Sequence, residues 1–389
     1  NLVAGNAVAK LNKLVGKWFL GADHPATGGY GYSSVSGSLF TSSGPSHNDE
    51  QQGYLGDCYL ISALGMIADS SQEAIRNMLV DNGVDARTGV HTWTVRFFYN
   101  GTADYVTVDN KLPTSNGSLI FQGIGSSPSN PKGLWLALAE KAYAQWNQTG
   151  REGRDGRNSY LSIEGGWMAN VDAQALGHAA SSYYVSTTSD RNALIAAVTN
   201  NMAVTIGTVT SSNANGALNY GLYGNHAYGI IGYNSTAQTF TLYNPWGVCQ
   251  PTKSLTWAEL KNVCDVFTVA NTSGTHPFGA GVTLAAVGPV LDTGMADQTK
   301  AAIDAAVSAP MVSHEAEGPR DAACLATWAV DAALAQQTPS AHNDFVRPVA
   351  QTSSAGTAFR GSNLALGSRA DHAAIDFATL AVDEFFQTV

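Results

Sequence analysis

Cys58 lies in the segment QGYLGDCYL, whose residue types and spacing suit nucleophilic chemistry. Apolar residues recur at helical spacing from Leu60 onward, which predicts a helix over 57–68 with Asp57 as its N-cap. A thiol reacts as its thiolate, and the N–H groups and dipole at a helix N-terminus lower its pKa. The commoner role of a buried cysteine is structural. The helix start makes Cys58 a candidate nucleophile beside that alternative.

Gln52 precedes Cys58 by six residues, with Gly53 and Gly56 between them. The two glycines permit a tight loop, which can return the Gln52 side-chain amide toward the thiol. An amide N–H beside the Cys58 backbone N–H would form an oxyanion hole for a tetrahedral intermediate. This spacing favours the catalytic role of Cys58 over the structural one.

Two predicted strands, one starting at His226 and the other ending at Asn244, can supply the base. If Tyr233 pairs with Thr239 across a short turn, His226 and Asn244 become diagonal neighbours on one face, and Trp246 lies opposite His226. Asn244 can then accept from one imidazole nitrogen and leave the other for the thiol. Trp246 would shield this hydrogen bond from water. A slip of one residue would break the arrangement.

His226 and Asn244 also have simpler interpretations. His226 could be a half-buried strand histidine with a satisfied ring, which is the commoner role of a single such residue. Asn244 could start a turn, since Pro245 keeps the residue before it extended. The coincidence of these two residues with the spacing of Gln52 and Cys58 favours a catalytic site.

Composition limits the class of protein without identifying it. The 389 residues are 44% hydrophobic and 13% charged, with a net charge of -10. This acidic balance argues against nucleic-acid binding, and no apolar run is long enough to cross a membrane. Four cysteines, without metal-binding spacing, are too few for a disulfide scaffold. The first residue is Asn1, so we expect that a signal or pro-segment could precede it; the composition leans toward export, with a cytoplasmic location also open.

The periodicity predicts an α+β protein with two lobes and a tail. We expect residues 1–178 to form an N-terminal segment and a helix-centred lobe, 179–272 a β-rich lobe, and 273–389 an Ala-rich, partly helical tail that is linker-like at 338–371. The predicted helices are 7–19, 57–68, 134–146 and 191–199. The predicted strands are 90–98, 105–108, 203–209, 226–233, 239–244 and 266–270.

The segments QGYLGDCYL, HAYGI and NPWG resemble the sequence motifs of the calpain family of papain-like cysteine peptidases. The segments VDNKLP, LALAEKAYAQW and EGGW are similar to the family in the same order, so the resemblance covers about residues 45–270. It implies a papain-like, two-lobed core with Cys on the helical lobe and His and Asn on the β-rich lobe. The roles that it implies are nucleophile for Cys58, oxyanion donor for Gln52, base and acid for His226, orienting group for Asn244 and shield for Trp246.

Several positions depart from the family pattern. Tyr59 stands where animal members usually have Trp, and Asn225 where a Gly commonly precedes the His; Gly56 and Asn225 are the further positions that the motifs place at the binding site. The resemblance implies calcium, and Asp49 fits one ligand position. Leu161 occupies the partner acidic position, and VCQPTKSLTW replaces the acidic loop expected after NPWG. These replacements argue against calcium dependence, and the thiol chemistry itself requires no cofactor.

These observations predict a calpain-like cysteine endopeptidase that cleaves protein or peptide substrates through an acyl-thioester. One alternative is a papain-like acyl transferase of the transglutaminase or amidase type, which more often orients its His with Asp. The other is a catalytically silent binding module that keeps the fold. The sequence leaves oligomeric state and substrate preference open.

Overall fold

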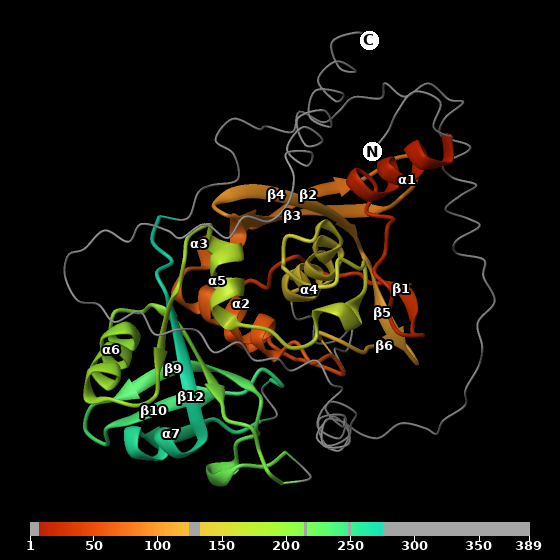
Figure 1. Ribbon diagram of the computed structural model, residues 1–389. Coiled ribbons are helices and arrows are strands. Elements are labelled where there is room, and N and C mark those ends of the chain that lie inside the picture. Colours follow the sequence, from red (N-terminus) through yellow and green to blue (C-terminus); the bar gives the residue numbers. More distant parts are fainter. Residues whose placement is uncertain (1–7, 124–132, 214–215, 248–249, 275–389) are drawn as a thin grey trace, which may run out of the picture. The chain divides into compact units, whose positions relative to one another are not determined.

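The computed structural model describes residues 8–123, 133–213, 216–247 and 250–274 (Figure 1). From residue 13 onward, the described chain belongs to one compact unit. The predicted division into two lobes at residue 178 stays a prediction. The predicted tail, including the linker-like stretch 338–371, lies outside the described residues except for 273 and 274.

The described chain has mixed helices and strands, which confirms the α+β class. All four predicted helices are present with small shifts at their ends. The helices are α1 Val8–Trp18, α2 Cys58–Ser70, α3 Gln72–Arg76, α4 Trp135–Trp146, α5 Met168–Leu176, α6 Thr188–Thr199 and α7 Trp257–Val263, with 3-10 turns η1 His47–Asp49, η2 Asn147–Thr149, η3 Tyr160–Ile163 and η4 Asn219–Gly221.

In the described part of the chain, the strands form three antiparallel sheets and include all six predicted strands. Two sheets have three strands each: β1 Gly31–Ser34, β5 Lys111–Ser115 and β6 Ser118–Leu119 in one, and β2 Leu79–Val84, β3 His91–Tyr99 and β4 Thr102–Asp109 in the other. The third has the order β11-β10-β9-β8-β12-β7, made by β7 Ser181–Tyr184, β8 Ala203–Thr208, β9 Ala227–Asn234, β10 Thr239–Tyr243, β11 Lys253–Thr256 and β12 Cys264–Ala270.

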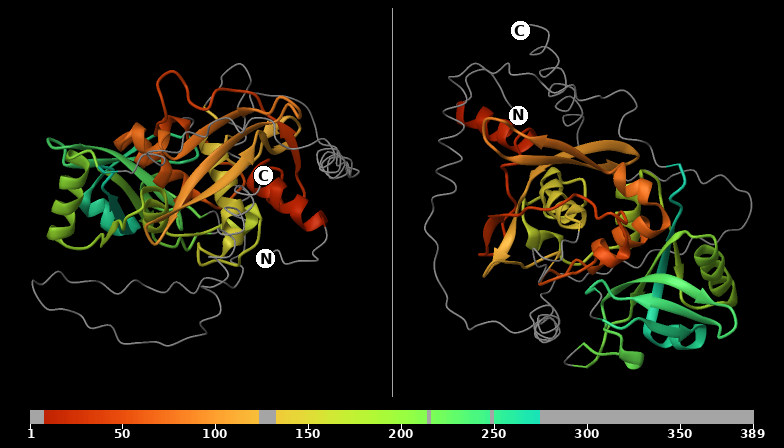
Figure 2. Two further views of the ribbon diagram at one scale, coloured as in Figure 1. Left: turned by 90° about the horizontal axis from the view of Figure 1, so that it is seen from above. Right: turned by 180° about the vertical axis from the view of Figure 1, so that it is seen from behind.

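Two hydrophobic cores underlie this arrangement. The larger contains α2, α4 and α5, and α4 packs against β3, β4 and β5 (Figure 2). The smaller lies within the six-stranded sheet and the helices α6 and α7 beside it (Figure 1). Helix α2 contacts α5 and α4 as well as β8 and β9. The helix that begins at Cys58 therefore lies directly against the sheet that carries His226.

The β9–β10 hairpin differs from the predicted register near its turn and agrees with it at its open end. Thr239 pairs with Asn234 instead of Tyr233, because the Asn234 side chain accepts from the backbone N–H groups of Thr236 and Ala237 and forms the turn itself. A bulge between Thr241 and Leu242 then shifts the pairing by one residue.

Beyond the bulge, Tyr243 pairs with Gly229, as the predicted register requires. The bulge thus offsets the one-residue difference at the turn before the strands reach the site. His226 and Asn244 therefore reach the same end of the hairpin despite the incorrect turn.

Candidate active site

Helix α2 holds Cys58 at its first residue. Ten consecutive residues of this helix, Tyr59 to Ala68, are buried, so the helix is anchored over most of its length. Burial raises the pKa of the Cys58 thiol to about 12, whereas hydrogen bonding from the Ala227 backbone and from the helix start acts in the opposite direction. The helix N-terminus thus lowers this pKa as expected, but desolvation of the thiol outweighs its N–H groups and the net shift is upward.

His226 and Asn244 are joined as the hairpin argument predicts. His226 Nε2 lies 2.9 Å from Asn244 Oδ1, and the Trp246 backbone N–H donates to the same oxygen at 3.1 Å. A backbone N–H can only donate, so the atom that it meets is the amide oxygen, and His226 Nε2 must be the protonated nitrogen. Nδ1 is then the basic nitrogen of the neutral ring.

Burial lowers the pKa of His226 to about 4, although the hydrogen bond to Asn244 acts in the opposite direction. The Trp246 ring is 4.8 Å from the imidazole ring between centroids and is itself buried, which agrees with a shielding role. Burial thus favours the neutral forms of both the His226 ring and the Cys58 thiol.

Backbone contacts place His226 just before β9, whereas the predicted strand included it. Its N–H donates to Thr208 Oγ1 and its carbonyl accepts from the Thr208 N–H, each at 3.0 Å. Asn225 has a φ of 51°, the left-handed conformation that Gly and Asn adopt most readily. This conformation explains why Asn can replace Gly before the His.

Close packing between α2 and β9 brings the thiol to the His strand. Ser62 Oγ donates to the Ala227 carbonyl at 3.2 Å. A Cβ on Gly229 would lie 2.6 Å from the end of the Met66 side chain, so the missing side chain lets the helix approach. The Ala227 backbone next to His226 consequently reaches the Cys58 thiol.

Gln52 lies at the site, but its amide is engaged within its own loop. Its backbone N–H donates to the Pro245 carbonyl at 2.9 Å, which joins the Cys58 loop to the turn after Asn244. Its Nε2 donates to the Leu55 carbonyl at 2.7 Å and to Asp57 Oδ1 at 3.3 Å. The role of Gln52 as oxyanion donor stays a prediction.

Asp57 is the N-cap residue of α2, as predicted, but its side chain makes no capping hydrogen bond. Its carboxyl group is turned instead toward Gln52 and Glu140. Gly56 contributes its carbonyl, which accepts from the Gly165 N–H at 2.8 Å and so ties the nucleophile loop to the EGGW segment. A role of Gly56 in substrate binding stays a prediction.

Asp49 uses its carboxylate within the protein. Its Oδ2 accepts from the Trp135 indole N–H at 2.8 Å and from the Ser46 backbone at 3.0 Å, which makes it part of a capping box for η1. Leu161 is 50% exposed. Within the described ranges, no three His, Cys, Asp or Glu side chains form a group that could hold a metal ion. Calcium binding at Asp49 stays a prediction.

Glu140 and Gln122 are two residues of the site that the sequence analysis missed. The Gln122 backbone N–H donates to both Glu140 oxygens, and the Gln122 side chain donates to the Asp49 carbonyl. Glu140 had a signal in the sequence, since it stands with Lys141 in a helix whose residues are otherwise mostly apolar. Every residue of α4 is buried, so an acid there requires a specific partner.

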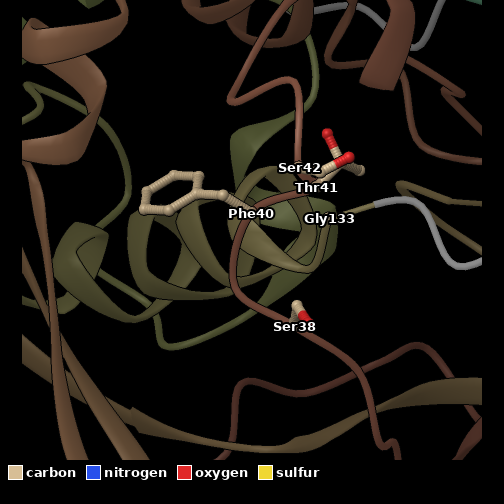
Figure 3. Close-up of a pocket in the computed structure, with 5 residues that line it drawn as sticks. All are labelled: Ser38, Phe40, Thr41, Ser42 and Gly133. Carbon is tan, nitrogen blue, oxygen red and sulfur yellow. The ribbon is translucent and has the colours of Figure 1, made fainter.

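A small pocket elsewhere on the chain contains none of the predicted site residues (Figure 3). It is lined by Ser38, Phe40, Thr41, Ser42 and Gly133. The Phe40 ring points away from the hydroxyl groups of Thr41 and Ser42. Without a charged or nucleophilic side chain in its lining, this pocket offers no chemistry comparable to that around Cys58.

The structure also has no helix long and apolar enough to span a membrane in the part of the chain that it describes.

Comparison with known proteins gives one consistent result. A sequence model of calpain family cysteine proteases matches residues 33–262, more than half of the chain. The chain is 29% identical to calpain clp-4 of Caenorhabditis elegans over 216 residues, which is 52% of this chain and 28% of that protein. It is 32% identical to the calpain-2 catalytic subunit of Gallus gallus over 128 residues (33% and 16%), and 26% identical to calpain-8 of Rattus norvegicus over 216 residues (54% and 29%). The match thus spans less than a third of each of these relatives.

Proposed function

We propose, from the premise that this chain belongs to the calpain family of cysteine proteases, that it is an endopeptidase with Cys58 as its nucleophile. The observation that carries the proposal is the Asn244 oxygen, which fixes the tautomer of His226 and leaves Nδ1 as base. Cys58 begins a helix whose packing brings the thiol to the strand of that histidine. These features support a papain-like, two-lobed catalytic core.

The proposed reaction starts when the Cys58 thiol loses its proton to His226 Nδ1 as the sulfur attacks the carbonyl carbon of a peptide bond. The Cys58 backbone N–H and the Gln52 amide stabilise the oxyanion that forms. His226 then returns the proton to the leaving amine, and a thioester remains on Cys58. Water attacks the thioester, His226 takes its proton, and the carboxylic acid and the thiol are released.

Substrate binding has a specific task in this proposal. The resting thiol and imidazole are both neutral, so the reaction needs proton transfer between them instead of a stored ion pair. General-base transfer requires the two groups within hydrogen-bond distance in the substrate complex. We propose that a bound polypeptide completes this approach, and that no cofactor takes part in the chemistry.

The test is hydrolysis of casein by the full chain and by Cys58→Ser. We expect the substitution to abolish cleavage without changing the thermal unfolding temperature by more than a few degrees, since it replaces one sulfur atom by oxygen. Cys264→Ser is the matched control, because that cysteine is buried in the smaller core away from the site. Cleavage by Cys58→Ser at the wild-type rate would refute the proposal. Transfer of the acyl group to added amines in preference to water would favour an acyl transferase instead.

A further inference from the structure

Two carboxyl groups, those of Asp57 and Glu140, meet in the interior directly before the nucleophile. Asp57 is 0% exposed and Glu140 is 2% exposed. The two carboxyl groups lie close enough for each to shift the pKa of the other. Two carboxylates repel and have no proton to donate, so a hydrogen bond between them requires one of the pair to be protonated.

Glu140 is held in place from the other side by Gln122. The Gln122 backbone N–H lies 3.0 and 3.2 Å from the two Glu140 oxygens. The Gln122 side chain accepts from the Gln51 N–H at 3.2 Å and donates to the Asp49 carbonyl at 2.8 Å. One residue therefore fixes both Glu140 and the chain immediately before Gln52.

Asp57 in turn contacts the side chain of Gln52. Its Oδ1 accepts from Gln52 Nε2 at 3.3 Å, while the Leu55 carbonyl accepts from the same nitrogen at 2.7 Å. Its Oδ2 is buried and accepts no hydrogen bond from an amide, hydroxyl or guanidinium group in the described part of the chain. Oδ2 is thus the atom available to a proton shared with Glu140.

We propose that Asp57 and Glu140 share one proton and together position the Gln52 carboxamide, so that Glu140 is a positioning residue of the active site. This inference rests on the proposed peptidase function, because it needs Gln52 to act on the oxyanion. The 3.3 Å contact with Asp57 is longer than an ordinary amide hydrogen bond. That N–H can turn to an oxyanion while Leu55 keeps the other N–H.

Loss of the shared proton at alkaline pH would leave two buried carboxylates in contact and release the Gln52 anchor. Burial raises the pKa of Asp57 to about 7, and burial with the charge of Asp57 raises the pKa of Glu140 well above its usual range. Glu164, Cys58 and Tyr59 are the other titratable groups that interact with Asp57, and Tyr32 and Tyr160 face Glu140. Burial raises the pKa of these tyrosines far above neutral, so none becomes charged over this range.

The test compares the pH dependence of kcat for four forms of the full chain. These are the wild type, Glu140→Gln, Gln52→Ala and the variant with both substitutions. Gln at 140 donates an N–H to Asp57 at every pH, so no titratable proton is needed. We expect Glu140→Gln to move the alkaline fall in kcat upward by about one pH unit or more. Gln52→Ala should lower kcat by roughly 10²- to 10³-fold. In that background, the pH profiles of kcat with Glu and with Gln at position 140 should coincide.

Asp172→Asn is the matched control. Asp172 is 2% exposed, burial raises its pKa to about 8, and Thr268 donates to it at 3.1 Å, away from Gln52. It should change the pH dependence of stability and leave the kcat profile as in the wild type. The positioning role is overturned if wild type and Glu140→Gln have the same profile, or if their difference persists in full without Gln52.

Urea unfolding from pH 5 to 9 tests the shared proton without any activity. The folded pair binds a proton that the unfolded chain has lost at neutral pH, so stability should fall as pH rises, and should fall less in Glu140→Gln. Equal pH dependence in the two proteins would overturn proton sharing. If the wild type cleaves no peptide, the proposed function fails, and this unfolding comparison alone decides whether the carboxyl groups share a proton.

Discussion

At the scale of single residues, the Oδ1 atom of Asn244 orients the His226 ring. It accepts from His226 Nε2 and from the Trp246 backbone at the same time, which fixes both the ring tautomer and the amide orientation. The sequence predicted that His226, Asn244 and Trp246 lie together, because each stands in a recognisable motif, and their contacts agree with this. The catalytic roles of these residues and of Cys58 stay predictions. The sequence could not show that burial keeps the thiol and the imidazole neutral, since desolvation depends on packing by distant segments.

Replacement of Asn244 tests this tautomer directly. Asn244→Ala should lower kcat by roughly 10²-fold or more, because Nδ1 is then no longer held as the basic nitrogen. Asn244→Asp keeps an acceptor for Nε2 and should retain more activity, with the acid side of its pH profile moved upward by the added negative charge. Steady-state kinetics with a fluorogenic peptide give both values. Equal activity of Asn244→Ala and the wild type would contradict the assignment.

The pH dependence of kcat/KM should reflect His226. Its pKa is lowered to about 4, so the ring stays neutral and able to accept a proton down to mildly acidic pH. We expect kcat/KM to fall only below about pH 5. Because the unfolded ring protonates near pH 6.5, the associated stability is present above that pH and is lost as pH falls toward 4. An acid limb centred near pH 6.5 would show that the His226 ring is solvated.

Close backbone contacts between loops set the geometry of the site at the scale of elements. Gln52 donates to the Pro245 carbonyl, and a Cβ on Gly247 would lie 2.5 Å from the Glu50 carbonyl oxygen. The order of elements could be predicted from periodicity, and the motif NPWG marked this turn. The bulge in the β9–β10 hairpin could not be predicted. Asn234 forms an unexpected turn that changes the strand register, and the register returns to the predicted one only at the bulge.

Gly247→Ala should therefore destabilise the protein and the site together. Gly247 has a φ of 100°, so a side chain there is strained and also meets backbone. We expect a loss of about 2 kcal/mol in unfolding free energy with a parallel loss of activity. Gly232→Ala is the control, because a Cβ on Gly232 would have no other atom within 4 Å and the φ of Gly232 is not left-handed. Similar stability of the two variants in urea titrations would argue against a constrained turn.

Residues 13–338 form one compact unit that contains every predicted site residue. The larger core includes Ala227 and Ala203 from the six-stranded sheet. The sheet therefore packs onto α2, the helix that begins at Cys58. The mixed fold and the order of its motifs were predictable because they depend on local patterns. Glu140 was missed because its importance lies in a contact with Asp57, which is 83 positions away along the chain.

Calcium independence is a prediction for the whole molecule. The Asp49 carboxylate already accepts from Trp135 and Ser46, and Leu161 offers no ligand where the family pattern has an acid. We expect the rate of casein cleavage to be the same with excess EGTA and with millimolar calcium. A rise in rate with calcium that Asp49→Asn removes would show that a metal does bind there.

The proposed mechanism requires Cys58 to carry the acyl group during catalysis. Intact-mass spectrometry after rapid acid quench of the protein with a peptide ester should show one acyl adduct, and peptide mapping should place it on Cys58. His226→Ala should accumulate far less adduct under the same conditions, because the thiol then has no base. An adduct on Cys264, or hydrolysis at the wild-type rate with no adduct and with Cys58 replaced, would contradict the account.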